Sequence, residues 1–117
     1  MKKTLALVLA FVMALSCTAA LAEEEEITIG ILATLTGYPL NGEHMVKGTQ
    51  LAADEINAAG GVLGKKLVLD VQDVSNTTDV AINATNLLIS KDVAALIGPH
   101  YSTQGLAIES LINAAEI

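Results

Sequence analysis

One short stretch, residues 98–105 with the sequence GPHYSTQG, concentrates hydroxyl, imidazole and amide side chains between two apolar segments. This stretch follows the apolar run 94–97 and places the hydroxyl groups of Ser102 and Thr103 just before another apolar segment. In open parallel sheets, ligands bind beyond the carboxyl ends of the strands. A helix that is entered through Ser and Thr offers hydroxyl groups and free backbone N–H groups to an anion. The stretch is therefore a candidate ligand loop, if the rest of the chain builds such a sheet.

The catalytic motifs considered do not fit this sequence. A serine hydrolase needs a Gly-x-Ser-x-Gly turn with a histidine and a carboxylate, whereas Ser102 lacks these glycines and His100 is too close in sequence to act as its base. Residues 60–66, GGVLGKK, only superficially resemble a phosphate-binding P-loop, because the hydroxyl residue is missing and a strand follows. The glycines at residues 30–37 do not have the dinucleotide-binding spacing. We therefore expect no enzyme, no cofactor and no metal site.

Composition narrows the possible partners. The chain has 117 residues, of which 52% are hydrophobic and only 3% aromatic, and its formal net charge is −7. This length suits one small globular unit at most. The negative charge argues against nucleic acid or an anionic membrane surface as a partner, and the few aromatic residues argue against a base-stacking surface.

The first 22 residues have the three parts of a secretory signal peptide: a basic start at residues 1–3, an apolar run at 5–15 and a small-x-small cleavage signal at 20–22. The apolar run is shorter than the ~20 residues that a permanent membrane span needs. We expect an exported protein that is cleaved after Ala22 and carries an acidic leader over residues 23–26. The alternative is lipid attachment at Cys17, the single cysteine, which would anchor the mature protein to the outer face of the cytoplasmic membrane.

Hydrophobic periodicity predicts alternating strands and helices from residue 27 onwards. The strands are expected over residues 27–32, 66–73 and 93–97, and the helices over residues 43–59, 79–90 and 106–115. Asn41 or Gly42 is expected to begin the first helix, and Gly60 to end it in a left-handed conformation. The apolar stripe expected on that helix consists of Met45, Gly48, Ala52, Ile56 and Ala59.

The order β-α-β-α-β-α with short connections predicts an α/β fold, a three-layer doubly wound parallel sheet. Residues 23–117 supply only three strands, although a central parallel strand must be paired on both sides. We therefore expect residues 27–117 to be the amino-terminal part of a larger protein.

Three motifs make the chain recognisable. They are IGIL at residues 29–32 with LTG at 35–37, AADEINAAGGVLGKKL at 52–67, and ALIGP at 95–99. Together they closely resemble the start of the branched-chain amino acid binding proteins of bacterial ABC importers, a type I periplasmic-binding family that binds leucine, isoleucine and valine. The resemblance runs from about residue 27 to residue 117.

The resemblance implies a two-lobed protein that closes on its ligand by a hinge motion, with this chain in the first lobe. It implies that the hydroxyl group of Ser102 holds the α-carboxylate of the ligand, with Tyr101 and Thr103 beside it. The family usually carries a ligand-facing aromatic residue just before a Gly-Glu or Gly-Asp pair. Here that position is Asn41, and the nearest aromatic residue is Tyr38, so the chain departs from the family pattern at the contact with the ligand side chain.

The partners that the resemblance implies are a small amino acid and the membrane permease of an ABC importer, with a monomeric full-length protein. An exported sensor domain of a receptor, a binder of amides or urea with the same fold, and an enzyme with catalytic residues elsewhere remain alternatives. We expect residues 23–117 alone to bind amino acids without useful affinity, because the family's other ligand contacts come later in the sequence.

Overall fold

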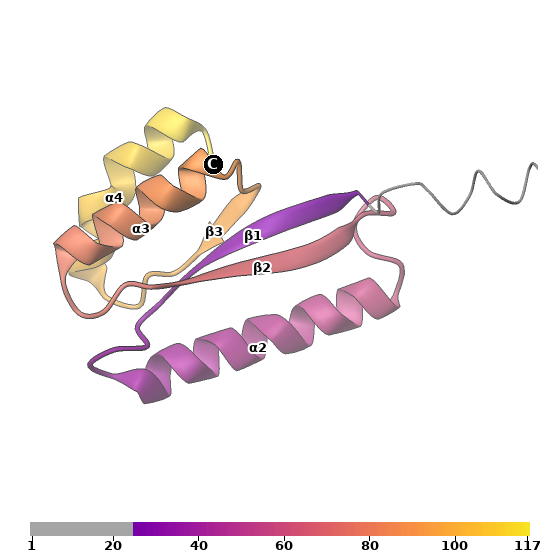
Figure 1. The fold of residues 1–117 in the computed structure, drawn as a ribbon, viewed down its shortest axis with the longest axis horizontal. Helices are drawn as coiled ribbons and strands as arrows, with labels where there is room; N and C mark the ends of the chain where they lie inside the picture. The colour runs from indigo at the N-terminus through magenta and orange to yellow at the C-terminus, as the bar shows by residue number, and fades with distance from the viewer. Residues whose placement is uncertain (1–24) are drawn as a thin grey trace, which may run out of the picture.

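The computed structural model describes residues 25–117, so the predicted signal peptide, Cys17 and the first residues of the acidic leader lie outside the described residues. The elements are β1 (Glu26–Ala33), α2 (Pro39–Ala58), β2 (Lys66–Asp73), α3 (Thr78–Ser90), β3 (Ala95–Ile97) and α4 (Ser102–Ala115). This alternating order confirms the prediction from periodicity (Figure 1).

The three strands form one parallel sheet in the order β2-β1-β3. The central strand β1 pairs with β2 along its whole length and with β3 over residues 29–31. Helix α2 covers one face of the sheet, while α3 and α4 pack against each other on the other face (Figure 1). The predicted three-layer α/β architecture is therefore confirmed.

The core lies between the sheet and α3 and α4, toward the carboxyl ends of the strands. The last four residues of β1 are buried, whereas the first four are only partly buried or exposed. In Figure 1 the amino-terminal halves of β1 and β2 extend beyond α3 and α4. The main buried cluster consists of Leu32, Val74, Ala81, Ala84, Leu88, Val93 and Ile108. The best-packed part of the molecule is thus the part that supports the candidate ligand loops.

Two helices begin earlier than predicted. Helix α2 starts at Pro39 and α4 at Ser102, and their N-cap residues are Tyr38 and Tyr101 without side-chain cap hydrogen bonds. Proline suits the first position of a helix because its missing N–H would have no intrahelical acceptor there. The prediction that Asn41 or Gly42 caps the first helix was therefore wrong, because both lie within its first turn.

The predicted apolar stripe of α2 was wrong at four of its five positions, because the helix is turned to bring other residues toward the sheet, and only Met45 of the five is half-buried. Gly48, Ala52, Ile56 and Ala59 are exposed. A Cβ atom on Gly42 would lie 2.2 Å from the carbonyl oxygen of Thr34, so the helix approaches the chain after β1 as closely as only glycine allows. The buried or half-buried positions of α2 are Gly42, Met45, Val46, Thr49, Ala53 and Asn57.

Asn57 joins the end of α2 to the start of β2. Its Nδ2 donates to the carbonyl oxygen of Leu67 at 2.8 Å, and its Oδ1 accepts from the N–H of Leu67 at 2.7 Å. The side chain thereby occupies both hydrogen-bonding groups of one residue of the edge strand. The helix then ends as predicted, since Gly60 has φ +105° and the N–H of Gly61 donates to the Ile56 carbonyl at 2.9 Å.

Replacing Asn57 by leucine is expected to lower the free energy of unfolding by about 1–3 kcal/mol, because both backbone groups of Leu67 would lose their partner in a partly buried place. Urea denaturation followed by circular dichroism measures the change. The matched control is Asn113→Leu at an exposed position of α4, which should change stability by less than about 0.5 kcal/mol. Equal losses in the two variants would show that the contact with Leu67 does not stabilise the fold.

Candidate functional site

The carboxyl ends of the parallel strands lead into three neighbouring loops, residues 34–38, 74–77 and 98–101. These loops carry hydroxyl, amide, imidazole and phenol groups but no Asp, Glu, Lys or Arg. This is the edge of an α/β sheet at which ligands bind, and its loops supply hydrogen-bonding groups without fixed charge.

Asp73, the last residue of β2, holds two of these loops together. Its Oδ1 accepts hydrogen bonds from the backbone N–H groups of Leu35 at 2.9 Å, Thr36 at 3.1 Å and Ser75 at 2.8 Å. Its Oδ2 accepts from the hydroxyl group of Thr36. The loop after β1 is thus fixed to the loop after β2 through one carboxylate.

The environment of Asp73 favours its ionised form. Burial alone would raise the pKa of this carboxyl, but the hydrogen bonds from the Thr36 hydroxyl and from the N–H groups of Ser75, Leu35 and Thr36 outweigh it and lower the pKa below the ordinary value of 3.8. The carboxylate therefore acts as an acceptor for backbone groups at neutral pH, and its oxygens are already occupied.

Gln104, in the first turn of α4, joins this helix to the loop after β2. Its side chain is 1% exposed, and Nε2 donates to the carbonyl oxygens of Val74 at 3.0 Å and Thr77 at 3.1 Å. Its Oε1 has no hydrogen-bond partner within the described part of the chain. The first turn of α4 is therefore anchored to residues 74–77. Sequence reasoning missed this role, because a glutamine in the first turn of a helix usually faces water.

Gly98 determines how the chain leaves β3. It has φ +97°, and a Cβ atom there would lie 2.5 Å from the carbonyl oxygen of Leu32 in β1. Only glycine fits this conformation and this close approach. Residues 99–101 are thereby directed across the end of the sheet toward α4.

Ser102 and Thr103 are the first two residues of α4, and both side chains are exposed. They were predicted to lie in a loop before the helix, so their position is a correction, although their place at the carboxyl edge is as expected. The backbone N–H groups at the start of a helix have no intrahelical acceptor, and the helix dipole adds partial positive charge there. Hydroxyl and N–H groups thus gather at a point suited to an anion.

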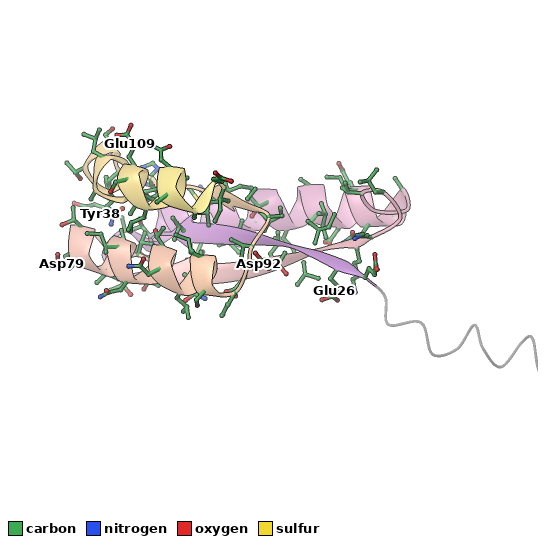
Figure 2. All side chains as sticks on the ribbon, turned by 90° about the horizontal axis from the view of Figure 1, so that it is seen from above. Glu26, Tyr38, Asp79, Asp92 and Glu109 are labelled. Atoms are coloured by element: carbon green, nitrogen blue, oxygen red, sulfur yellow. The ribbon has the colours of Figure 1, made fainter. Side chains whose placement is uncertain are left out.

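The chain's two tyrosines come together beside this helix start. The rings of Tyr38 and Tyr101 pack edge to face with centroids 6.3 Å apart, and His100 packs against Tyr101 at 5.1 Å. Nδ2 of Asn41 lies 3.2 Å from Nε2 of His100. Figure 2 places Tyr38 at the same end of the molecule as Asp79, which lies at the start of α3.

The structure therefore brings together three of the five predicted site residues, Tyr38, Asn41 and Tyr101, and places the other two directly after Tyr101. It adds His100, which was not among the predicted site residues. No signal in the sequence links Asn41 with His100, since 59 positions separate them.

Other features of the described residues suggest no second site. A hollow of about 350 Å³ lies at the opposite end of the sheet, lined by Asn57, Lys66 and the glycines 60, 61 and 64. Over residues 25–117, no group of three His, Cys, Asp or Glu side chains could hold a metal ion. None of the helices in that range is long and apolar enough to cross a membrane.

Comparison with known families gives one matching family model, described as periplasmic binding protein, over residues 26–117. Leu/Ile/Val-binding protein BraC3 from Rhizobium johnstonii is 38% identical over 71% of this chain and 22% of its own length. Leu/Ile/Val-binding protein homolog 8 from Brucella suis is 34% identical over 89% of this chain and 26% of its own length.

Two solved structures that resemble this chain are substrate-binding proteins of transporters. The branched-chain amino acid transporter substrate binding protein LivJ from Streptococcus pneumoniae, in complex with isoleucine, superposes with a TM-score of 0.69 and 31% identity, over 81% of this chain and 27% of that one. An ABC transporter substrate-binding protein from Sphaerobacter thermophilus gives a TM-score of 0.72 and 33% identity over 80% of this chain and 25% of that one. The chain thus spans about a quarter of the length of these relatives.

Asp73→Asn is expected to lower the free energy of unfolding at pH 7 by about 1–3 kcal/mol, because the backbone donors of two loops lose a charged acceptor. The pKa of Asp73 is lowered in the folded state, so its stabilisation is fully present above the ordinary value of 3.8 and is lost as pH falls through the folded-state pKa. The difference between wild type and variant should therefore shrink as pH falls below about 4.

Urea denaturation at a series of pH values measures this difference. Glu109→Gln, which removes an exposed carboxylate from α4, is the control and should leave stability nearly unchanged at pH 7. A gap between wild type and Asp73→Asn that stayed constant from pH 7 to pH 3 would contradict the role of the ionised carboxylate.

Proposed function

The chain belongs to the periplasmic binding protein family, and we propose that it forms one wall of the ligand cleft of an extracytoplasmic solute-binding protein. The ligand is a branched-chain or related small amino acid, which the protein captures between two lobes and delivers to the permease of an ABC importer. Support comes from the relatives, which are named as Leu/Ile/Val-binding and ABC transporter substrate-binding proteins. Because the chain spans about a quarter of their length, the second lobe and the permease contact are parts of the proposal.

The observation that carries this proposal is the start of α4 at the carboxyl edge of the sheet. Ser102 and Thr103 present exposed hydroxyl groups at the first two positions of the helix, where their backbone N–H groups lack intrahelical acceptors. A ligand carboxylate placed there accepts from a hydroxyl group and from N–H groups, and the helix dipole stabilises its negative charge.

The surroundings of this helix start favour an anion further. Gln104 anchors the same turn to residues 74–77, so the donors are held in place before a ligand arrives. No acidic side chain occurs in the three loops at this edge, and the nearby Asp73 already accepts four hydrogen bonds. A preorganised site of this kind loses less entropy on binding than a mobile one.

The family also bears on whether the protein is an enzyme and on where it is located. The relatives are transport binding proteins rather than enzymes, which agrees with the catalytic motifs that do not fit the sequence. Membership of the family places the protein outside the cytoplasm. Export by a signal peptide ending at Ala22, a lipid anchor at Cys17 and a monomeric state are further parts of the proposal.

The chain alone is expected to bind amino acids more weakly than micromolar, because the family's other ligand contacts come later in the sequence. Nuclear magnetic resonance detects binding in the millimolar range and can therefore test the carboxylate contact on the chain. Titration of the ¹⁵N-labelled chain with L-alanine is expected to shift the amide signals of residues 102–105, and L-alaninamide, which lacks the carboxylate, should not shift them. Ser102→Ala should weaken alanine binding about fivefold, or by roughly 1 kcal/mol, because one hydrogen bond to the carboxylate is lost.

The matched control is Ser110→Ala, which removes an exposed hydroxyl group two turns further along α4 and should leave the affinity within a factor of two. The proposal fails if alanine does not perturb residues 102–105. It fails equally if Ser102→Ala and Ser110→Ala bind alike, or if alaninamide binds as well as alanine.

A further inference from the structure

We infer that the side-chain subsite of this protein selects a neutral hydrogen-bonding group, an amide or a hydroxyl, over an aliphatic one, and that Asn41 and His100 make this selection. The inference rests on the proposed function, because it takes the start of α4 as the place where the ligand carboxylate is held. It differs from the Leu/Ile/Val specificity for which the relatives are named.

Asn41 and His100 contact each other through their side chains. Asn41 lies in the first turn of α2 and His100 in the loop before α4, and their side chains meet at 3.2 Å between Nδ2 and Nε2. When the Asn41 amide donates to His100, Nε2 accepts and the imidazole proton lies on Nδ1. The pair then retains an amide oxygen, a second amide N–H and the Nδ1–H, and within residues 25–117 it makes no other side-chain hydrogen bond.

The Asn41–His100 pair lies next to the proposed carboxylate site at Ser102. His100 and Ser102 are two residues apart, so their Cα atoms lie within about 7.6 Å of each other. One amino acid can bridge that distance with its carboxylate at Ser102 and its side chain at the Asn41–His100 pair. Tyr101 lies between them in sequence, and its ring packs against both His100 and Tyr38.

The loops around the Asn41–His100 pair carry no fixed charge. The loops 34–38, 74–77 and 98–101 contain no Asp, Glu, Lys or Arg, although the whole chain carries a formal charge of −7. A charged ligand side chain would find no counter-ion among these loop residues. A neutral amide or hydroxyl can instead use both the donors and the acceptor that Asn41 and His100 leave free.

An aliphatic side chain is the unfavourable case. It would displace water from the polar groups of Asn41 and His100 and offer them no hydrogen bond in return. Sites that hydrogen-bond a ligand group discriminate strongly against an analogue that lacks the group, whereas apolar pockets discriminate weakly against an added hydroxyl. The subsite is therefore expected to favour the polar member of an isosteric pair.

The experiment compares such pairs by titration of the ¹⁵N-labelled chain. L-asparagine is compared with L-leucine, and L-threonine with L-valine, because the members of each pair have nearly the same shape. Asparagine and threonine are expected to bind at least about tenfold more tightly than their partners. Asn41→Leu and His100→Phe should each reduce this preference to less than about threefold, and Asn113→Leu, an exposed position on α4, should preserve it.

The possible results of these titrations separate the inference from the proposed function. If leucine binds as well as asparagine while alanine still requires Ser102, the inference is wrong and the proposed function stands. If the preference for asparagine survives both Asn41→Leu and His100→Phe, the pair does not make the selection and the inference is also wrong. If no amino acid perturbs residues 98–105, both proposals fail. Should Asn41→Leu lose the dispersed amide spectrum of a folded chain, His100→Phe decides alone.

Discussion

The interaction on which the rest of this structure depends is the hydrogen bonding of Asp73 to the loops on either side of it. Three parallel strands end at one edge, and each continues into a loop that has no regular hydrogen bonds of its own. Asp73 fixes the loop after β1 to the loop after β2, and Gln104 fixes the start of α4 to that same second loop. Two side chains thereby connect the loops after β1 and β2 and the start of α4, at the edge where an α/β sheet binds ligands.

Close backbone contacts give this edge its shape. Gly42 lets α2 approach the carbonyl of Thr34, and Gly98 lets the chain leave β3 against the carbonyl of Leu32. Both contacts lie at the carboxyl ends of the strands, where burial is also greatest. The amino-terminal halves of β1 and β2 are less covered (Figure 1). Packing is therefore tightest where the proposed ligand donors must be held still.

The sequence was sufficient for the architecture, because periodicity and glycine positions depend on local rules. It placed β2 at residues 66–73, where the structure has it, and the motifs led to the family that the comparisons support. It failed at the starts of α2 and α4, since polar residues were expected as caps whereas tyrosines without cap hydrogen bonds precede Pro39 and Ser102. It also failed for the side of α2 that faces the sheet, on which Gly42 lies against the carbonyl of Thr34.

Some residues of the candidate site could be predicted from the sequence, and others could not. Ser102 and its neighbours could be named from the motif, but their role in ligand binding stays a prediction. Asp73, Gln104 and His100 act through partners that are 37, 30 and 59 positions away, and no local pattern predicts such contacts.

A crystal structure of the chain grown with a saturating amino acid would show whether the start of α4 holds the ligand carboxylate. We expect a carboxylate oxygen within about 2.5–3.0 Å of the Ser102 hydroxyl oxygen, with the ligand side chain toward Asn41 and His100. An amino acid bound elsewhere on the chain, with the start of α4 left free, would contradict this expectation.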